Sequence, residues 1–168
     1  TDVKKSLQDS KYYIITALIG LDGEKIDLPE SFYYMTCHRE ENTGTDDTLT
    51  EILDAMETLD HQCIYPVHPR NKAHVKRLVK EKKYLNTIVC EPVGYLMSVY
   101  LVNHSKKIVT DSGGLQREAF FAGKQCVTIF DYVVWPETMV GNRNQLAKAE
   151  KNDILDKLEC AQHITEDN

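Results

Sequence analysis

The sequence lacks several features that would place the protein in a common class. Its formal net charge is −6 and no basic patch stands out, which argues against nucleic acid or an anionic membrane as a partner. The longest apolar run near its beginning, residues 12–20, is too short to cross a bilayer and is not followed by a signal-peptide cleavage pattern. No internal repeat and no low-complexity segment is present.

The chain also lacks the patterns of several common active sites. Its five cysteines form no CxxC pair, and four of them lie in or beside apolar strand-like segments, so we expect buried free thiols in a reducing cytoplasm. No two histidines lie four residues apart with an acidic partner, so we expect no zinc and no other cofactor. Ser112 is not in a G-x-S-x-G elbow and no Ser-His-Asp triad can be assembled, which argues against a hydrolase.

What the 168 residues do contain is an alternation of strand-like and helix-like segments, in a chain long enough for one domain with a real core. The chain begins with a helix-like segment at residues 2–21, of which residues 12–15 could also be extended, and a polar loop. Strands are expected at residues 31–37, 62–67, 86–90, 107–110, 125–130 and 145–147. Helices are expected at residues 48–60, 73–83, 94–104, 113–122 and 152–162. The alternation predicts an α/β fold, a Rossmann-like parallel sheet with helices on both faces.

Three details of the helices can be predicted as well. The segment 94–104 is apolar almost all round, so we expect it to be well buried. Gly123 is placed to end the helix before it, and Asn152 to cap the last helix.

Residues 106–118 (KKIVTDSGGLQRE) organise the rest of the chain, since they predict a buried strand, a tight turn and a helix start. Asp111 and Ser112 can cap this helix, and Gly113 and Gly114 carry no Cβ where a ligand must approach the backbone. The first turn of a helix suits a phosphate, and Glu118 one turn later could accept hydrogen bonds from ribose hydroxyls. The alternative is an ordinary strand-to-helix turn that binds nothing.

Polar residues follow four of the other expected strands. His38 follows the first strand, His68 the second, Glu91 the third, and a loop with Trp135 the fifth. Because the carboxyl ends of parallel strands meet at one edge of the sheet, these groups and the Ser-Gly-Gly turn should gather there.

Each of these groups has a plainer interpretation too. His38 can donate to a phosphate or act as acid or base, or it can cap its own loop. His68 and Arg70 can face a ligand, although a solvated loop arginine is common, and Glu91 is expected to be structural. The remaining histidines are expected at the surface or partly buried: His61, His74, His104 and His163.

Four motifs in this order and spacing resemble the non-hydrolysing UDP-N-acetylglucosamine 2-epimerases. They are residues 36–42 (TCHREEN), 66–69 (PVHP), 110–118 (TDSGGLQRE) and 136–137 (PE). The resemblance covers residues 31–158 and corresponds to the C-terminal half of the family protein. With a first residue Thr1 instead of Met, it leads us to expect a fragment, residues 1–168 being a UDP-binding domain without its N-terminal partner domain.

The resemblance implies one half of a GT-B-type two-domain fold. It implies that His38 contacts the diphosphate close to the chemistry and that Glu118 binds the ribose. His68 would support the substrate region or a neighbouring regulatory sugar-nucleotide site. The phosphates would be held by Ser112, Gly113 and Gly114, and the remaining residues implied at the substrate are Arg39 and Trp135.

The family reaction inverts C2 of the sugar by eliminating UDP to a 2-acetamidoglucal and adding it back. The family's acid and base carboxylates come from the N-terminal domain, so the fragment should bind part of UDP without epimerising, and the full-length protein should be a homodimer. The sequence departs from the family pattern at residues 130–137 (FDYVVWPE), which lack two arginines, and at Ser98, where an aromatic residue is usual. The departures leave open a modified UDP-sugar (uronic acid or diacetamido) and a non-catalytic sugar-nucleotide module. A GT-B glycosyltransferase on the same scaffold is a further alternative, which the complete motif at residues 38–42 disfavours.

Overall fold

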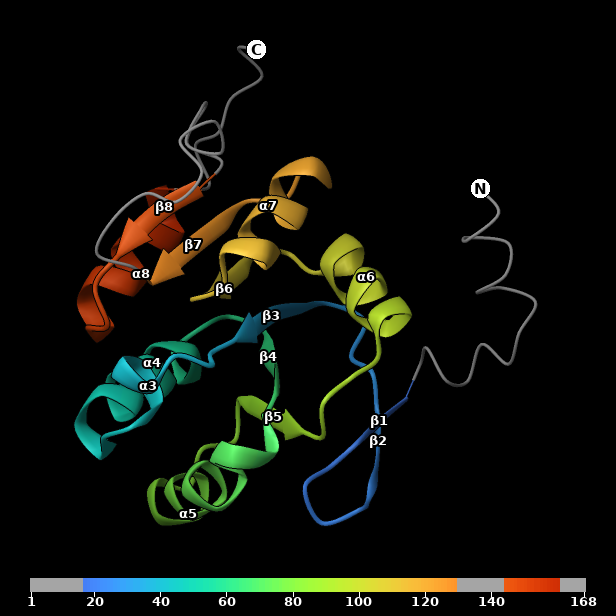
Figure 1. Ribbon diagram of the computed structural model, residues 1–168, viewed down its shortest axis with the longest axis vertical. Helices are drawn as coiled ribbons and strands as arrows, with labels where there is room; N and C mark the ends of the chain where they lie inside the picture. The colour runs from blue at the N-terminus through green and yellow to red at the C-terminus, as the bar shows by residue number, and fades with distance from the viewer. Residues whose placement is uncertain (1–16, 130–143, 161–168) are drawn as a thin grey trace.

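The computed structural model describes residues 17–129 and 144–160. Within them, six parallel strands form one sheet in the order β5-β4-β3-β6-β7-β8 (Figure 1). The strands are β3 (Phe32–Thr36), β4 (Gln62–Pro66), β5 (Thr87–Cys90), β6 (Ile108–Thr110), β7 (Cys126–Ile129) and β8 (Asn144–Ala147). The predicted parallel sheet is therefore confirmed, and β4 ends at Pro66, in agreement with the preference of proline for strand ends.

Helices connect the strands in the predicted alternation. They are α3 (Glu40–Thr43), α4 (Asp46–Glu57), the 3₁₀ turn η1 (Pro69–Asn71), α5 (Lys72–Lys82), α6 (Tyr95–His104), α7 (Gly113–Phe121) and α8 (Lys151–Cys160). Thr45 caps α4, its hydroxyl accepting from Thr48 N, which explains why the helix starts before the predicted residue 48.

The start of the described chain differs from the prediction. A helix was expected through residue 21 and a loop at residues 23–30, but β1 (Ala17–Ile19) and β2 (Lys25–Asp27) form an antiparallel hairpin. Gly23 at its turn has a φ of +86°, and Gly20 bridges to Cys90 at the end of β5. The apolar residues here satisfy a helical spacing, but pairing between strands decides the structure. The rest of the predicted helix, residues 2–16, lies outside the described residues.

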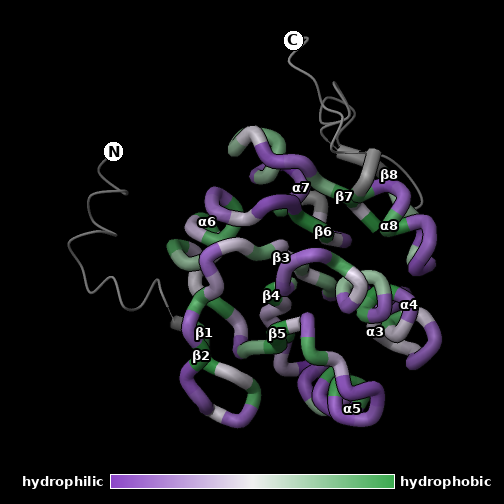
Figure 2. The backbone as a smooth tube through the Cα atoms, turned by 180° about the vertical axis from the view of Figure 1, so that it is seen from behind, coloured by the Kyte–Doolittle hydropathy of each residue, from purple (hydrophilic) through white to green (hydrophobic). Residues whose placement is uncertain are grey.

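Two hydrophobic cores cover the two faces of the sheet, as the alternation of side chains along a strand requires. On one face Tyr33 and Met35 pack with residues of α4, α5 and α8. On the other, Phe32 and Tyr34 pack with residues of α6 and α7. Figure 2 shows the hydrophilic outer turns of α5 at the edge of the molecule. From β3 the chain adds β4 and β5 on one side of the sheet, and from β6 it adds β7 and β8 on the other side. Helices α4 and α5 cover one face, whereas α6 and α7 cover the opposite face.

Two helix predictions need correction and one is confirmed. Helix α6 is not well buried: Tyr95 is 74% exposed and Leu96 46%, because an outer-layer helix meets the sheet on one side only, whatever its composition. Asn152 does not cap α8; the helix begins at Lys151, whose N–H donates to Glu51 Oε1 of α4 at 2.8 Å. Gly123 follows α7 with a φ of +73°, as its predicted role at the helix end requires.

The described cysteines agree with the sequence. Cys37, Cys63, Cys90 and Cys126 are free and buried, and burial raises the pKa of the Cys90 and Cys126 thiols to about 12. These thiols are therefore inert at neutral pH. Among residues 17–129 and 144–160, no helix is long and apolar enough to cross a bilayer.

Candidate functional site

The candidate site lies where β3 and β6 run side by side at the centre of the sheet. Their register pairs Thr36 with Thr110, and the hydroxyls of these two threonines are 2.7 Å apart in the buried last layer before the strands end. Helices leave β3 and β6 toward opposite faces, which opens a crevice beyond their carboxyl ends. Ligands of open α/β sheets bind in this place.

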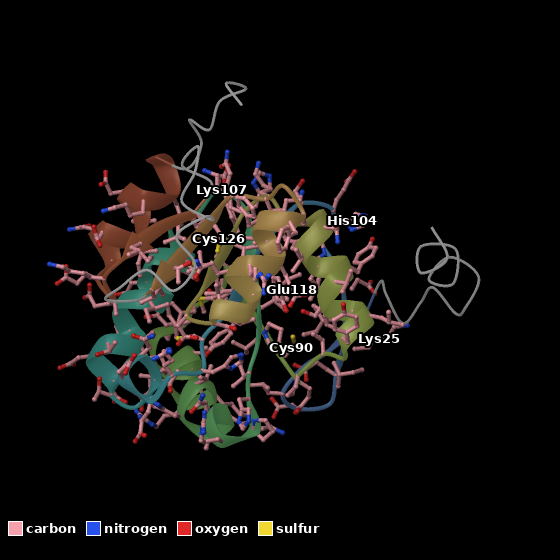
Figure 3. The ribbon with its side chains drawn as sticks, turned by 45° about the horizontal axis from the view of Figure 1, so that its top comes forward. Lys25, Cys90, His104, Lys107, Glu118 and Cys126 are labelled. Carbon is pink, nitrogen blue, oxygen red and sulfur yellow. The ribbon has the colours of Figure 1, made fainter. Side chains whose placement is uncertain are left out.

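A cavity of about 300 Å³ occupies the crevice. Its lining comes from β3, the loops after β4 and β5, α6 and the start of α7: Tyr34, Thr36, His38, Pro66, His68, Pro92, Val93, Ser98, Ser112, Gly114, Leu115 and Glu118. In Figure 3 Glu118 lies on α7 close to α6, with Cys90 at the end of β5 below them. The cavity thus lies at the carboxyl ends of the four neighbouring strands β5, β4, β3 and β6, and helices α6 and α7 form its walls.

The start of α7 provides the donors for an anion. Ser112 is the N-cap, and its hydroxyl accepts from Leu115 N at 3.3 Å. A Cβ on Gly114 would meet nothing nearer than Ser112 Oγ at 3.7 Å, so this residue leaves space on the cavity side. With the positive end of the helix dipole directed into the cavity, this turn can hold a phosphate group.

Two histidines stand at the other side of the cavity. The rings of His38 and His68 meet edge to face with 6.3 Å between their centroids. Arg70 N donates to His68 Nδ1 at 3.0 Å, which fixes the hydrogen of a neutral His68 ring on Nε2. Arg70 Nη2 donates to the carbonyl oxygen of His38 at 3.1 Å, so this arginine holds the loop that carries His38.

His38 itself is half-buried, and burial lowers the pKa of its imidazole. The negative charge of Asp111 raises that pKa, and His68 and Arg70 lower it. The balance favours a neutral ring in the free protein. An anion bound next to the ring would raise this pKa, since negative charge stabilises the imidazolium.

Asp111 has a different role from the one predicted. Instead of capping α7, its carboxylate accepts from His38 N at 3.0 and 3.1 Å, from Arg39 N at 2.9 Å and from Asn42 Nδ2 at 2.9 Å. Cys37 Sγ lies 3.4 Å from the same carboxylate, and Asp111 is only 1% exposed. The end of β6 therefore holds the whole loop that follows β3.

The far end of the cavity carries a pair of hydroxyls. Tyr34 OH and Ser98 Oγ are 3.0 Å apart and join β3 to α6. Burial raises the pKa of the Tyr34 phenol, the bond with Ser98 lowers it, and the charges of Cys90 and Glu118 raise it. Tyr34, Ser98 and Glu118 line the same cavity.

Of the predicted site residues, five line the cavity: His38, His68, Ser112, Gly114 and Glu118. Arg39 donates from Nε to the carbonyl oxygen of Asp111 and from Nη1 to Glu41, and Gly113 is the first residue of α7. Trp135 and its neighbours lie outside the described residues. Their binding roles stay predictions.

The sequence did not identify other parts of the lining: Tyr34, Thr36, Pro92, Val93 and Leu115. Tyr34 could have been found from strand alternation, because it shares a face with Phe32 and Thr36. Glu91 pairs with Lys72 at 2.8 Å, in agreement with its expected structural role. In the described part of the chain, no group of three His, Cys, Asp or Glu side chains could hold a metal ion.

Comparison with known proteins identifies the family. The model of the family "UDP-N-acetylglucosamine 2-epimerase" matches residues 11–167. The chain belongs to this family. A UDP-N-acetylglucosamine 2-epimerase homolog of Methanococcus maripaludis is 38% identical over 132 residues, 77% of this chain and 37% of the relative. A UDP-2,3-diacetamido-2,3-dideoxy-D-glucuronate 2-epimerase of Pseudomonas aeruginosa is 35% identical over 156 residues, 89% of this chain and 42% of the relative.

Solved structures give the same result. The UDP-GlcNAc 2-epimerase of Methanocaldococcus jannaschii in complex with UDP-GlcNAc and UDP superposes with a TM-score of 0.76 at 26% identity, over 95% of this chain and 43% of that one. An Escherichia coli heptosyltransferase with ADP shares the fold alone, with a TM-score of 0.54 at 13% identity. The described sheet is therefore one Rossmann-like half of a GT-B-type fold, and the chain spans about two fifths of the length of the relatives named here.

Proposed function

We propose that this chain is the C-terminal, UDP-binding half of an enzyme that converts UDP-N-acetylglucosamine to UDP-N-acetylmannosamine by inverting C2. The observation that carries the proposal is the cavity at the β3–β6 crevice, which brings His38, the start of α7 and Glu118 together in a chain of the 2-epimerase family. A relative of the same fold has been solved with UDP-GlcNAc and UDP.

The cavity has room and chemistry for a nucleoside diphosphate laid from the histidines toward α6. The diphosphate sits at Ser112 and Gly114, where helix N–H groups supply donors, with His38 on its other side. Glu118 lies one turn further along α7 and accepts from the ribose hydroxyls. The uracil then lies against the wall that contains Val93 and Ser98.

In this arrangement the chain assists departure and return of UDP. Cleavage of the bond between C1 of the sugar and the diphosphate oxygen leaves negative charge on UDP, which the α7 N–H groups and a protonated His38 stabilise. The C2 proton must leave from one face of the sugar and return on the other, which requires an acid and a base. We propose that the carboxylates for this step come from the partner domain, so residues 1–168 alone bind UDP without turnover.

The same proposal covers the setting of the whole protein. We infer a cytoplasmic homodimer that needs no cofactor. The four buried free thiols support a reducing compartment. The dimer and the lack of a cofactor come from the family resemblance.

The experiment is deuterium exchange at C2. The full-length protein is incubated with UDP-N-acetylglucosamine in heavy water without any acceptor, and the sugar is followed by NMR. Deuterium at C2 together with a manno product is the expected result. If C2 keeps its proton and no 2-epimer forms, the proposed substrate is wrong. Exchange in a diacetamido-glucuronate sugar nucleotide instead would move the assignment to that substrate.

A further inference from the structure

The buried carboxylate of Asp111 accepts hydrogen bonds from the loop that carries His38. Asp111 directly follows β6, is 1% exposed, and receives its hydrogen bonds from residues about 70 positions earlier in the chain. A carboxylate in such a place is stable only when donors compensate for the lost water. Here the donors are the backbone of His38 and Arg39 and the side chain of Asn42, so the charge and the loop stabilise each other.

The two carboxylate oxygens are used unequally. Oδ2 accepts from Arg39 N at 2.9 Å, Asn42 Nδ2 at 2.9 Å and His38 N at 3.1 Å, and Cys37 Sγ lies 3.4 Å away. Oδ1 accepts from His38 N at 3.0 Å. Both oxygens must therefore be acceptors, which an ionised aspartate satisfies and an asparagine does not.

The His38 ring has little else to hold it. Its Nδ1 is buried and has no hydrogen-bond partner among the described residues, and the ring meets His68 only edge to face. Helix α3 begins directly after Arg39 with no side-chain cap of its own. The position of the imidazole in the cavity thus depends on its backbone, and Asp111 and Arg70 hold that backbone.

We propose that Asp111 is a positioning residue for the proposed reaction. It fixes the His38 imidazole in the cavity through the backbone of residues 38 and 39, and it supplies the negative charge that the imidazolium needs. The other ionisable groups that face His38 are His68 and Arg70 after β4 and Glu118 across the cavity. His68 and Arg70 disfavour the imidazolium, so Asp111 provides the opposing charge from β6.

The test compares Asp111→Asn with Asp60→Asn in the full-length protein. Asp60 is a matched control, because its carboxylate accepts the Tyr33 hydroxyl at 2.6 Å just before β4, at the opposite end of the sheet. Two quantities are measured: the titration midpoint of His38 by NMR without ligand, assigned with a His38→Gln variant, and the affinity for UDP. Only the second rests on the proposed function.

Asp111→Asn is expected to lower the titration midpoint of His38, since the negative charge is gone. It should also weaken UDP binding about tenfold, because an amide N–H now faces the His38 N–H and loosens the loop. Asp60→Asn should change neither. A folded Asp111→Asn protein with a native His38 midpoint and UDP affinity within about twofold of native overturns the proposal. If the native protein binds no UDP, the proposed function fails, and the His38 midpoint still decides the role of Asp111.

A second variant covers the case in which Asp111→Asn does not fold. Asn42→Ala keeps the charge and removes one donor, so the loop loosens without a mismatched buried amide. We expect UDP affinity to fall about threefold or more, with no fall in the His38 midpoint. Native UDP affinity in this variant would overturn the positioning role.

Discussion

The hydroxyl of Tyr34 lies 3.0 Å from that of Ser98, and this hydrogen bond ties the sheet to α6 at the end of the cavity opposite the histidines. Tyr34 is 2% exposed, whereas Ser98 is half-buried. The two partners therefore differ in what they lose when the bond is broken.

Removing either partner should give unequal losses of stability. Ser98→Ala leaves a buried phenol without a partner, at a cost of about 1–3 kcal/mol, whereas Tyr34→Phe leaves a serine that water can reach, at a cost of about 0.5–1.5 kcal/mol. Urea unfolding of the two variants measures the difference. A larger loss for Tyr34→Phe would contradict the assigned burial.

A methyl group at residue 114 should affect binding and not folding. Gly114→Ala places its Cβ in open space, 3.7 Å from Ser112 Oγ, so we expect native stability or a gain within about 1 kcal/mol from helix propensity. UDP affinity should fall about tenfold, because the methyl group occupies the place proposed for phosphate. Calorimetric titration with UDP and a thermal melt provide the two readouts.

The matched control is the glycine at the other end of the helix. Gly123 has a φ of +73°, so Gly123→Ala should destabilise the protein by about 1 kcal/mol and leave UDP affinity native. The proposed phosphate position is wrong if Gly114→Ala binds UDP as well as Gly123→Ala does.

The protonation of His38 should couple binding to pH. Burial lowers the pKa of the free imidazole and a bound diphosphate raises it, so complex formation takes up a proton between the two values. Affinity for UDP-N-acetylglucosamine should increase as pH falls from the pKa of His38 in the complex to its lowered pKa in the free protein. Calorimetry in buffers of different ionisation heat measures the proton uptake, and His38→Gln should abolish it.

The same shift has the opposite sign for the stability of the unliganded fold. A histidine whose pKa is lowered by folding stabilises the native state above the unfolded-state pKa. This contribution is lost as pH falls through the folded-state pKa. As pH falls, the affinity for the ligand should therefore increase while the stability of the unliganded fold decreases. If proton uptake on binding is unchanged in His38→Gln, the effect belongs to another group.

Much of the fold could be predicted because strands and helices alternate at clear spacings. The segments that became β3, β4, β5, β6, β7 and β8 were all identified as strands. The hairpin at residues 17–27 is not predicted, because its apolar residues also fit a helical period. The pairing of β1 with β2 and the bridge from Gly20 to Cys90 decide between the two.

The site could be predicted in outline and not in its connections. The carboxyl ends of parallel strands meet at one edge, and this rule alone brought His38, His68 and Ser112 together. The role of Asp111 could not be read from its motif, where a helix cap is the local expectation. It depends on the β3–β6 register, which places residue 111 beside the loop after Thr36.

The most direct measurement is the affinity of the full-length protein for UDP and for 2′-deoxy-UDP, in native form and with Glu118→Ala. Glu81→Ala on the exposed face of α5, paired with Arg77, is the control. We predict that the native protein and the control bind UDP about tenfold more tightly than the deoxy compound, and that Glu118→Ala loses both the tight binding and the preference. Native affinity and an intact preference in Glu118→Ala would contradict the placement of the nucleotide in the β3–β6 crevice.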